Sequence, residues 1–148
     1  ALPIFDYLML SALSCTPNLL LYLPTKTGIP ESDRVEIHKW LAWGRDNEEY
    51  LFVRHDLFDW PCKGAVDGSA HLLGDHGLIF LFNPAAEKRM AEFVLNAEST
   101  GFTGEKPVTL VQEYPTGDWC ETRQPGTIIR LPVPGEAVLV VRLISSSG

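Results

Sequence analysis

The stretch from Asp67 to Pro84 limits the possible folds of this chain most strongly. Gly74 and Gly77 enclose a short turn, and the run Leu78–Phe82 behind it is wholly apolar until it stops at Asn83-Pro84. A short apolar run bounded by Gly and Asn-Pro turn signals is typical of a buried β-strand. The stretch therefore indicates a β-sandwich rather than an enzyme pocket.

The rest of the C-terminal half repeats this pattern of short apolar runs separated by turn residues. Strands at near-regular spacing are typical of a sandwich or barrel. We expect a mainly β fold, an antiparallel β-sandwich of about 6–8 strands over residues 71–148. The expected strands are 71–74, 78–82, 89–95, 107–113, 126–131 and 137–144.

Residues 1–53 have a different character and predict a helix-strand-helix segment. Apolar residues lie nearly all round Ile4–Leu13, which predicts a buried helix. Leu19–Leu23 predicts a buried strand between two prolines. A second helix is expected from Pro30 to about Tyr50, with an apolar face made of Ile37, Trp40, Leu41 and Gly44.

Residues 54–70 contain Pro, Gly and charges of both signs, which predicts a connector between the two halves.

The chain of 148 residues has 45% hydrophobic residues, enough for a real core. Its net charge of -7 argues against nucleic acid or an anionic membrane as a partner. No membrane helix and no signal peptide are recognisable, and the compartment stays open.

The three cysteines, Cys15, Cys62 and Cys120, are widely spaced and form no CxxC pair, so we expect no zinc site. We expect free or partly buried thiols. A Cys62–Cys120 disulfide is the alternative if the protein is exported.

Taken in order, these segments resemble the end of a TIM-barrel glycoside hydrolase and its C-terminal β-domain. The nearest likeness is to the α-galactosidase (melibiase) clan and related bacterial hydrolases. It rests on Thr16–Pro24 as the last barrel strand, Ile29–Leu51 as the last barrel helix, Gly77–Pro84, and the closing Pro134–Val141.

The resemblance implies that the catalytic pair of Asp residues lies on earlier barrel strands, so no catalytic residue is expected in this chain. It places Thr25, Lys26 and Thr27 on the rim of the active site. It also implies that residues 1–50 have apolar surface to cover, against the remainder of a larger enzyme, a second copy, or the sandwich itself. No cofactor and no metal are expected.

Other chemistry has less support in the residues. Glycosidases use paired carboxylates, and either Asp56 with Asp59 or Asp67 with Asp75 could form such a pair. Both pairs lie in connector or turn sequence, where Asp is common for backbone reasons. A metal cluster is conceivable for His71, Asp75 and His76, but we expect these residues in a solvated turn.

Aromatic residues are better candidates for binding a carbohydrate, because a sugar presents an apolar C–H face that stacks on an aromatic ring. Trp60 in the connector, Trp119 in a loop and nearby Tyr114 could form such a platform, with Lys26 on the rim. The alternative is that Trp60 plugs the seam between the halves and Trp119 caps the sandwich. Trp40 and Trp43 are expected to pack.

We therefore expect a non-catalytic C-terminal β-sandwich region that stabilises or assists a carbohydrate-active enzyme. One alternative is a free-standing module that binds carbohydrate or protein. A weaker alternative is a small enzyme whose site the sequence does not reveal.

Overall fold

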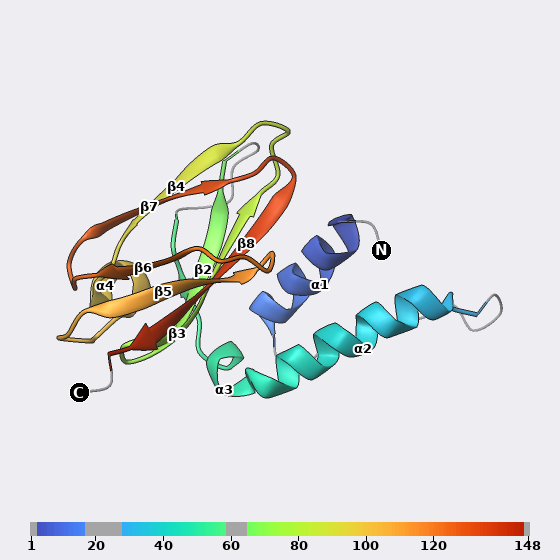
Figure 1. The fold of residues 1–148 in the computed structure, drawn as a ribbon, viewed down its shortest axis with the longest axis horizontal. Coiled ribbons are helices and arrows are strands. Elements are labelled where there is room, and N and C mark those ends of the chain that lie inside the picture. Colours follow the sequence, from blue (N-terminus) through green and yellow to red (C-terminus); the bar gives the residue numbers. More distant parts are fainter. Residues whose placement is uncertain (1–2, 17–27, 59–64, 147–148) are drawn as a thin grey trace.

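The computed structural model describes residues 3–16, 28–58 and 65–146, and in these it forms four helices and eight strands (Figure 1). The helices are α1 (Pro3–Cys15), α2 (Glu31–Asp46), α3 (Glu48–Leu51) and α4 (Ala97–Thr100). The strands are β1 (His55–Asp56), β2 (Asp67–Leu73), β3 (His76–Asn83), β4 (Arg89–Val94), β5 (Val108–Tyr114), β6 (Cys120–Arg123), β7 (Ile128–Val133) and β8 (Ala137–Ser145).

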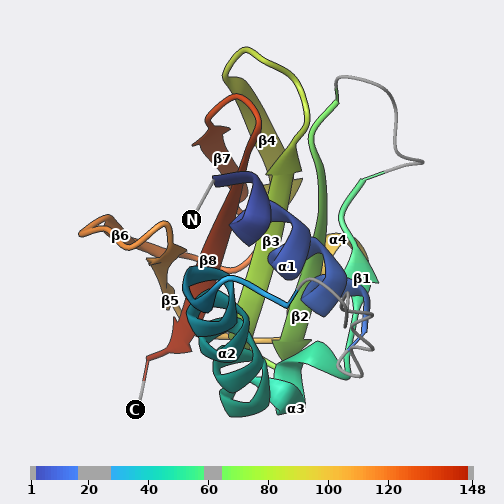
Figure 2. The ribbon, with the colours of Figure 1, turned by 90° about the vertical axis from the view of Figure 1, so that its right-hand side faces the viewer.

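The strands form two antiparallel sheets, and the helices add a third layer. The large sheet has the order β1-β2-β3-β8-β5-β6, and β4 pairs with β7 in a small sheet. The small sheet covers one face of the large sheet, whereas α1, α2 and α3 lie against the other face (Figures 1 and 2). The mainly β fold class expected from the sequence is confirmed.

Strand β3 lies in the middle of these layers, which explains why its run Leu78–Phe82 is wholly apolar. Successive side chains of a strand point to opposite faces of the sheet. Ile79 and Leu81 therefore join the core below the small sheet, while Leu78, Phe80 and Phe82 join the core below the helices. Both faces of this strand are buried, so neither allows a polar residue in the run.

The helices pack on the large sheet through a second hydrophobic core. Leu10 and Leu13 of α1 and Trp40 of α2 are buried against Phe80 and its neighbours. Gly44 of α2 allows a close approach, because a Cβ atom there would lie 3.0 Å from Cδ2 of Leu13. Residues 31–51 are therefore held on the sandwich of the same chain.

The expected elements agree with the structure in position but differ at several boundaries. Strand β2 begins at Asp67, inside the stretch 54–70 expected to be a connector, and β1 lies within that stretch as well. Strand β6 and the short helix α4 were missed. The expected helix over residues 30–50 divides at Asn47 into α2 and α3. The expected strand at Leu19–Leu23 lies outside the described residues.

No helix in the described part of the chain is long and apolar enough to cross a membrane.

Candidate functional site

Two of the aromatic residues proposed as a sugar platform, Trp119 and Tyr114, lie on different sides of the large sheet. Trp119 is half-buried against the core shared by the two sheets, and its carbonyl accepts a hydrogen bond from Gln112 N. Tyr114 packs instead against the core below the helices. Trp119 and Tyr114 therefore do not form one flat surface. Trp60 and Lys26 lie outside the described residues.

A β-bulge in β5 gives Tyr114 its orientation. The pairing register between β5 and β8 shifts between Gln112 and Tyr114, leaving Glu113 as the extra residue. Such a residue interrupts the alternation of the strand, and both Glu113 and Tyr114 make contacts with the helical layer. Two consecutive polar side chains are thereby directed at α1 and α2.

Tyr114 joins the sheet to both long helices through Asp6 of α1. The Tyr114 hydroxyl donates to Asp6 Oδ2 at 2.7 Å, and Trp40 Nε1 donates to Asp6 Oδ1 at 2.8 Å. The rings of Trp40 and Tyr114 also meet edge to face, with centroids 5.3 Å apart. Burial and the Asp6 carboxylate raise the pKa of Tyr114, so its hydroxyl stays protonated as the donor.

Glu113 forms a second link with Arg142 of β8. Arg142 Nε and Nη2 donate to the two carboxylate oxygens of Glu113, each at 2.9 Å, and Trp43 Nε1 of α2 donates to Oε1 at 3.0 Å. Arg142 Nη2 also donates to Asn47 Oδ1 at 2.7 Å, at the end of α2. The hydrogen bonds from Arg142 lower the pKa of Glu113 and keep it ionised.

The carboxylates proposed as a catalytic pair do not converge where both are described. Asp67 begins β2 and Asp75 follows its other end, in the turn before β3. At the rise of a β-strand, roughly 20 Å separates them, about twice the largest spacing of a glycosidase pair. Asp56 is exposed and paired with Arg54, and its proposed partner Asp59 lies outside the described residues.

His71 does not lie in a solvated turn, contrary to the expectation from the sequence. It sits in the middle of β2, wholly buried below the helices, with its ring beside Phe80. Nε2 shares a hydrogen bond of 2.9 Å with Ser69 Oγ, and Nδ1 has no partner among the described residues. Burial lowers the pKa of His71 to about 4, which the nearby backbone of Val53 and Tyr50 only partly offsets.

His76 is half-exposed and pairs with Asp75, with Nδ1 and Oδ1 3.0 Å apart. No three His, Cys, Asp or Glu residues come together as metal ligands in residues 3–16, 28–58 and 65–146. Cys15 and Cys120 are exposed free thiols, and Cys62 lies outside the described residues.

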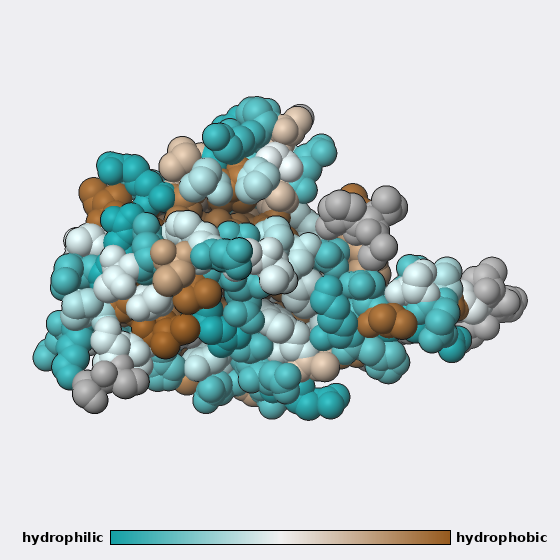
Figure 3. Space-filling view, in the orientation of Figure 1, coloured by the Kyte–Doolittle hydropathy of each residue, from teal (hydrophilic) through white to brown (hydrophobic). Residues whose placement is uncertain are grey.

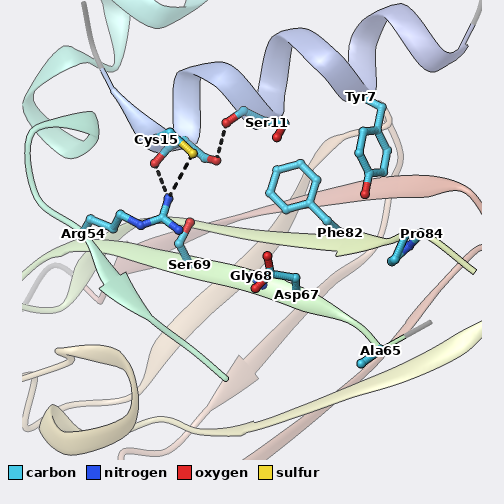
Figure 4. A pocket seen from close by; sticks show the side chains of 11 residues that line it. Tyr7, Ser11, Cys15, Arg54, Ala65, Asp67, Gly68, Ser69, Phe82 and Pro84 are labelled. Atoms are coloured by element: carbon cyan, nitrogen blue, oxygen red, sulfur yellow. Dashed lines mark hydrogen bonds between the residues drawn. The ribbon is translucent and has the colours of Figure 1, made fainter. Parts of the chain in front are cut away.

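A hollow of about 160 Å³ lies between α1 and the strands β2 and β3. Tyr7 and Ser11 line it from α1, Asp67 from β2 and Phe82 from β3 (Figure 4). Arg54 lies at one end, where Nη1 donates to the carbonyl of Ser14 at 2.6 Å near the last turn of α1. Sequence patterns did not single out the α1 residues of this hollow, because only the docking of α1 on the sheet creates it.

The fold as a whole occurs in glycoside hydrolases. The chain superposes on a protein from Bacillus halodurans C-125 described as an α-N-acetylgalactosaminidase, with a TM-score of 0.60, 11% identity, and coverage of 97% of this chain and 31% of that one. It also superposes on α-galactosidase I from Mortierella vinacea, with a TM-score of 0.59, 10% identity, and coverage of 98% and 36%.

An α-amylase from Geobacillus thermoleovorans, solved with acarbose, gives a TM-score of 0.59, 12% identity, and coverage of 99% and 34%. The chain thus spans about a third of each structure, the share expected of a C-terminal portion. No family model matches the chain, and no curated protein matches it in sequence. At these identities the likeness defines a shared fold.

Proposed function

We propose that this chain is the non-catalytic C-terminal region of a carbohydrate-active enzyme and stabilises the catalytic part. The observation that carries the proposal is the attachment of the helical layer to the sandwich by hydrogen bonds as well as by an apolar core. One polar link joins Asp6, Trp40 and Tyr114, and the other joins Trp43, Glu113 and Arg142. Directional hydrogen bonds of this kind fix how helices sit on a sheet, beyond what apolar contact alone achieves.

The outward side of α1 supports attachment to a further part of the protein. Ile4 and Leu8 lie one helical turn apart and are 63% and 60% exposed, although the opposite side of α1 is buried on the sheet. Elsewhere, on the face seen in Figure 3, hydrophobic residues form small separate patches among hydrophilic ones. We propose that Ile4 and Leu8 pack on the catalytic part of the enzyme.

The three structural relatives are named for α-linked sugars, which suggests an α-glycoside as the substrate class of the whole enzyme. The test compares the 148-residue chain with the longest reading frame that contains it. Both are assayed with p-nitrophenyl α-galactoside, p-nitrophenyl α-N-acetylgalactosaminide and maltooligosaccharides. We expect hydrolysis by the longer protein alone.

A variant separates the stabilising role from a role in binding substrate. In the longer protein, Leu8→Asn should lower the temperature at which activity is lost and leave KM unchanged. Ile144→Asn is the matched control, since Ile144 is exposed on β8, away from α1. Hydrolysis by the 148-residue chain itself, or a reading frame that encodes no catalytic domain, would refute the proposal.

A further inference from the structure

The hollow between α1 and β2 has the features of a small binding site. Tyr7 and Ser11 are four residues apart, so they lie on the same side of α1 and face the strands. Asp67 faces them from β2, and the Phe82 ring lies beside Tyr7 with centroids 5.3 Å apart (Figure 4). We propose that this hollow binds a neutral polyhydroxylated ligand of one ring, such as a monosaccharide.

Three hydrogen-bonding groups in the hollow are left for a ligand. The hydroxyls of Tyr7 and Ser11 have no partner among the described residues. Asp67 Oδ1 accepts from Gly68 N at 2.8 Å, which leaves the second carboxylate oxygen available. Because burial and the charge of Asp67 raise the pKa of Tyr7, its hydroxyl keeps its proton and can donate.

The charges around the hollow select against anions and metal ions. Arg54 is already engaged, since Nε donates to Asp56 Oδ1 at 2.9 Å and Nη1 to the carbonyl of Ser14. Arg54 is the cation among the described residues that line the hollow, and its charge is paired with Asp56, so an anion would meet the carboxylate of Asp67 with little positive charge to balance it. A metal ion would find a single carboxylate, because the described residues hold no group of three ligands.

Size and surface chemistry favour a sugar ring among neutral ligands. A hollow of about 160 Å³ is smaller than the ~300 Å³ at which pockets for drug-sized molecules begin, so it suits one ring. The Phe82 side chain, most of which is buried in the core, lines the hollow as an apolar wall against which the C–H groups of a sugar can pack. The Asp67 carboxylate would accept from sugar hydroxyls, and the two protein hydroxyls can donate to them or accept from them.

This site belongs to the 148-residue chain alone, so its test does not depend on a catalytic domain. We would titrate the ¹⁵N-labelled chain with galactose, glucose and N-acetylgalactosamine and follow the amide signals by NMR. Sorbitol, glucuronate, phosphate and Ca²⁺ serve as competing classes. We expect saturable shifts at Tyr7–Ser11 and Asp67–Ser69, with a dissociation constant on the order of 1 mM for at least one of the three sugars.

Two variants test the groups that carry the proposal. Asp67→Asn keeps the oxygen that accepts from Gly68 N but loses the charge, and should weaken binding about tenfold. Tyr7→Phe keeps the ring and should weaken binding about fivefold. Asp75→Asn and Tyr50→Phe are the matched controls outside the hollow and should bind as the wild type does.

Saturation by a sugar that both variants weaken and both controls retain would support the site. The proposal fails if none of the three sugars saturates, or if the shifts centre on Trp119. It fails equally if glucuronate, phosphate or Ca²⁺ alone binds, or if both variants bind as well as wild type. A melting curve for each variant shows that it is folded, and Tyr7→Phe stands as a second probe should Asp67→Asn melt early.

Discussion

The two faces of the large sheet are buried in different ways. The face toward β4 and β7 meets its partner through a core of apolar side chains such as Ile79, Leu81 and Phe93. The face toward the helices has an apolar core too, but it also holds a buried histidine and the two polar links. The side toward β4 and β7 is thus mostly apolar but includes a buried neutral hydrogen bond, in which Nδ2 of Asn83 donates to the carbonyl of Val133 in β7 at 3.1 Å. The side toward the helices holds ionisable groups as well.

The two sides separate the contribution of apolar burial from that of charged hydrogen bonds. Apolar burial is nondirectional and roughly proportional to area, and it provides most of the contact with β4 and β7, where the Asn83 amide adds a directional bond at one end of β7. Hydrogen bonds to Asp6 and Glu113 require particular positions of α1 and α2. Because the pKa values of Glu113 and His71 are shifted on this side, the helical side should respond to pH more strongly than the other side.

The largest effect should come from truncating neighbouring residues of β3 that face opposite sides. Phe80 and Leu81 are both wholly buried. Phe80→Ala should cost about 3–5 kcal/mol of unfolding free energy, and Leu81→Ala about 2–5 kcal/mol. Hydrogen exchange should show early loss of protection in α1 and α2 for Phe80→Ala, and in β4 and β7 for Leu81→Ala. An identical exchange pattern in both variants would argue against two separable faces.

His71 should make stability fall on acidification. Its pKa is lowered from 6.5 to about 4 in the folded chain, so the unfolded chain takes up the proton first. The free energy of unfolding is therefore highest above pH 6.5, where His71 is neutral in both states. It declines by up to about 3 kcal/mol as the pH falls toward 4.

Urea unfolding of His71→Gln across this pH range should show a shallower slope than wild type. His76→Gln is the control and should keep the wild-type slope, because His71 remains. Equal slopes for His71→Gln and wild type would mean that His71 titrates alike in the folded and unfolded chain.

Glu113 should contribute more to the free energy of unfolding than an exposed glutamate that is also paired with an arginine. Glu113→Gln should cost about 2 kcal/mol, because it weakens the paired hydrogen bonds from Arg142. Glu92→Gln on the outer face of β4 should cost about 0.5 kcal/mol or less, since Glu92 and Arg130 are exposed.

Both costs are measured by urea unfolding at neutral pH and two salt concentrations, and salt should reduce the smaller one more strongly. The pKa of Glu113 is lowered, so its contribution is present above pH 4.5 and is lost as the pH falls further. Similar costs for both variants would show that the partly buried position of Glu113 does not matter.

Tyr114→Phe should give the smallest effect among the polar links. It removes one hydrogen bond to Asp6 while Trp40 keeps the other, so the expected cost is about 1 kcal/mol. Thermal melting measures this cost, with Tyr50→Phe as the control. A loss several times larger would indicate that Asp6, Trp40 and Tyr114 act as a cooperative network.

Sequence patterns predicted the strands that are apolar and bounded by turns. They failed for segments that form a strand only because they pair with a neighbouring strand. Cys120–Arg123 has no apolar alternation, and it became β6 because it lies at the edge beside β5. Asp67 and Gly68 look like a turn, yet they pair with Phe82 and Leu81 as the start of β2. Local patterns cannot show such pairings, since the partner lies elsewhere in the chain.

For the candidate sites too, local sequence indicated some residues, and others became recognisable only in the folded chain. Trp119 could be singled out as an aromatic in a loop, but the core it packs against is visible only in the folded chain. Asp6 is the one charged residue of the helix Pro3–Cys15, and this was the available sign of a buried contact. The bulge that turns Glu113 toward the helices leaves no mark in the residues around it.

Local sequence patterns were enough to predict the sandwich, the two long helices and the apolar run Leu78–Phe82, because periodicity and turn residues act over a few neighbours. Which face each polar residue meets depends on how the layers pack. Asp6 reaches Tyr114, and Tyr7 comes to face Asp67, only once α1 lies on the sheet. These contacts join residues up to 108 positions apart, and only the packed layers bring such residues together.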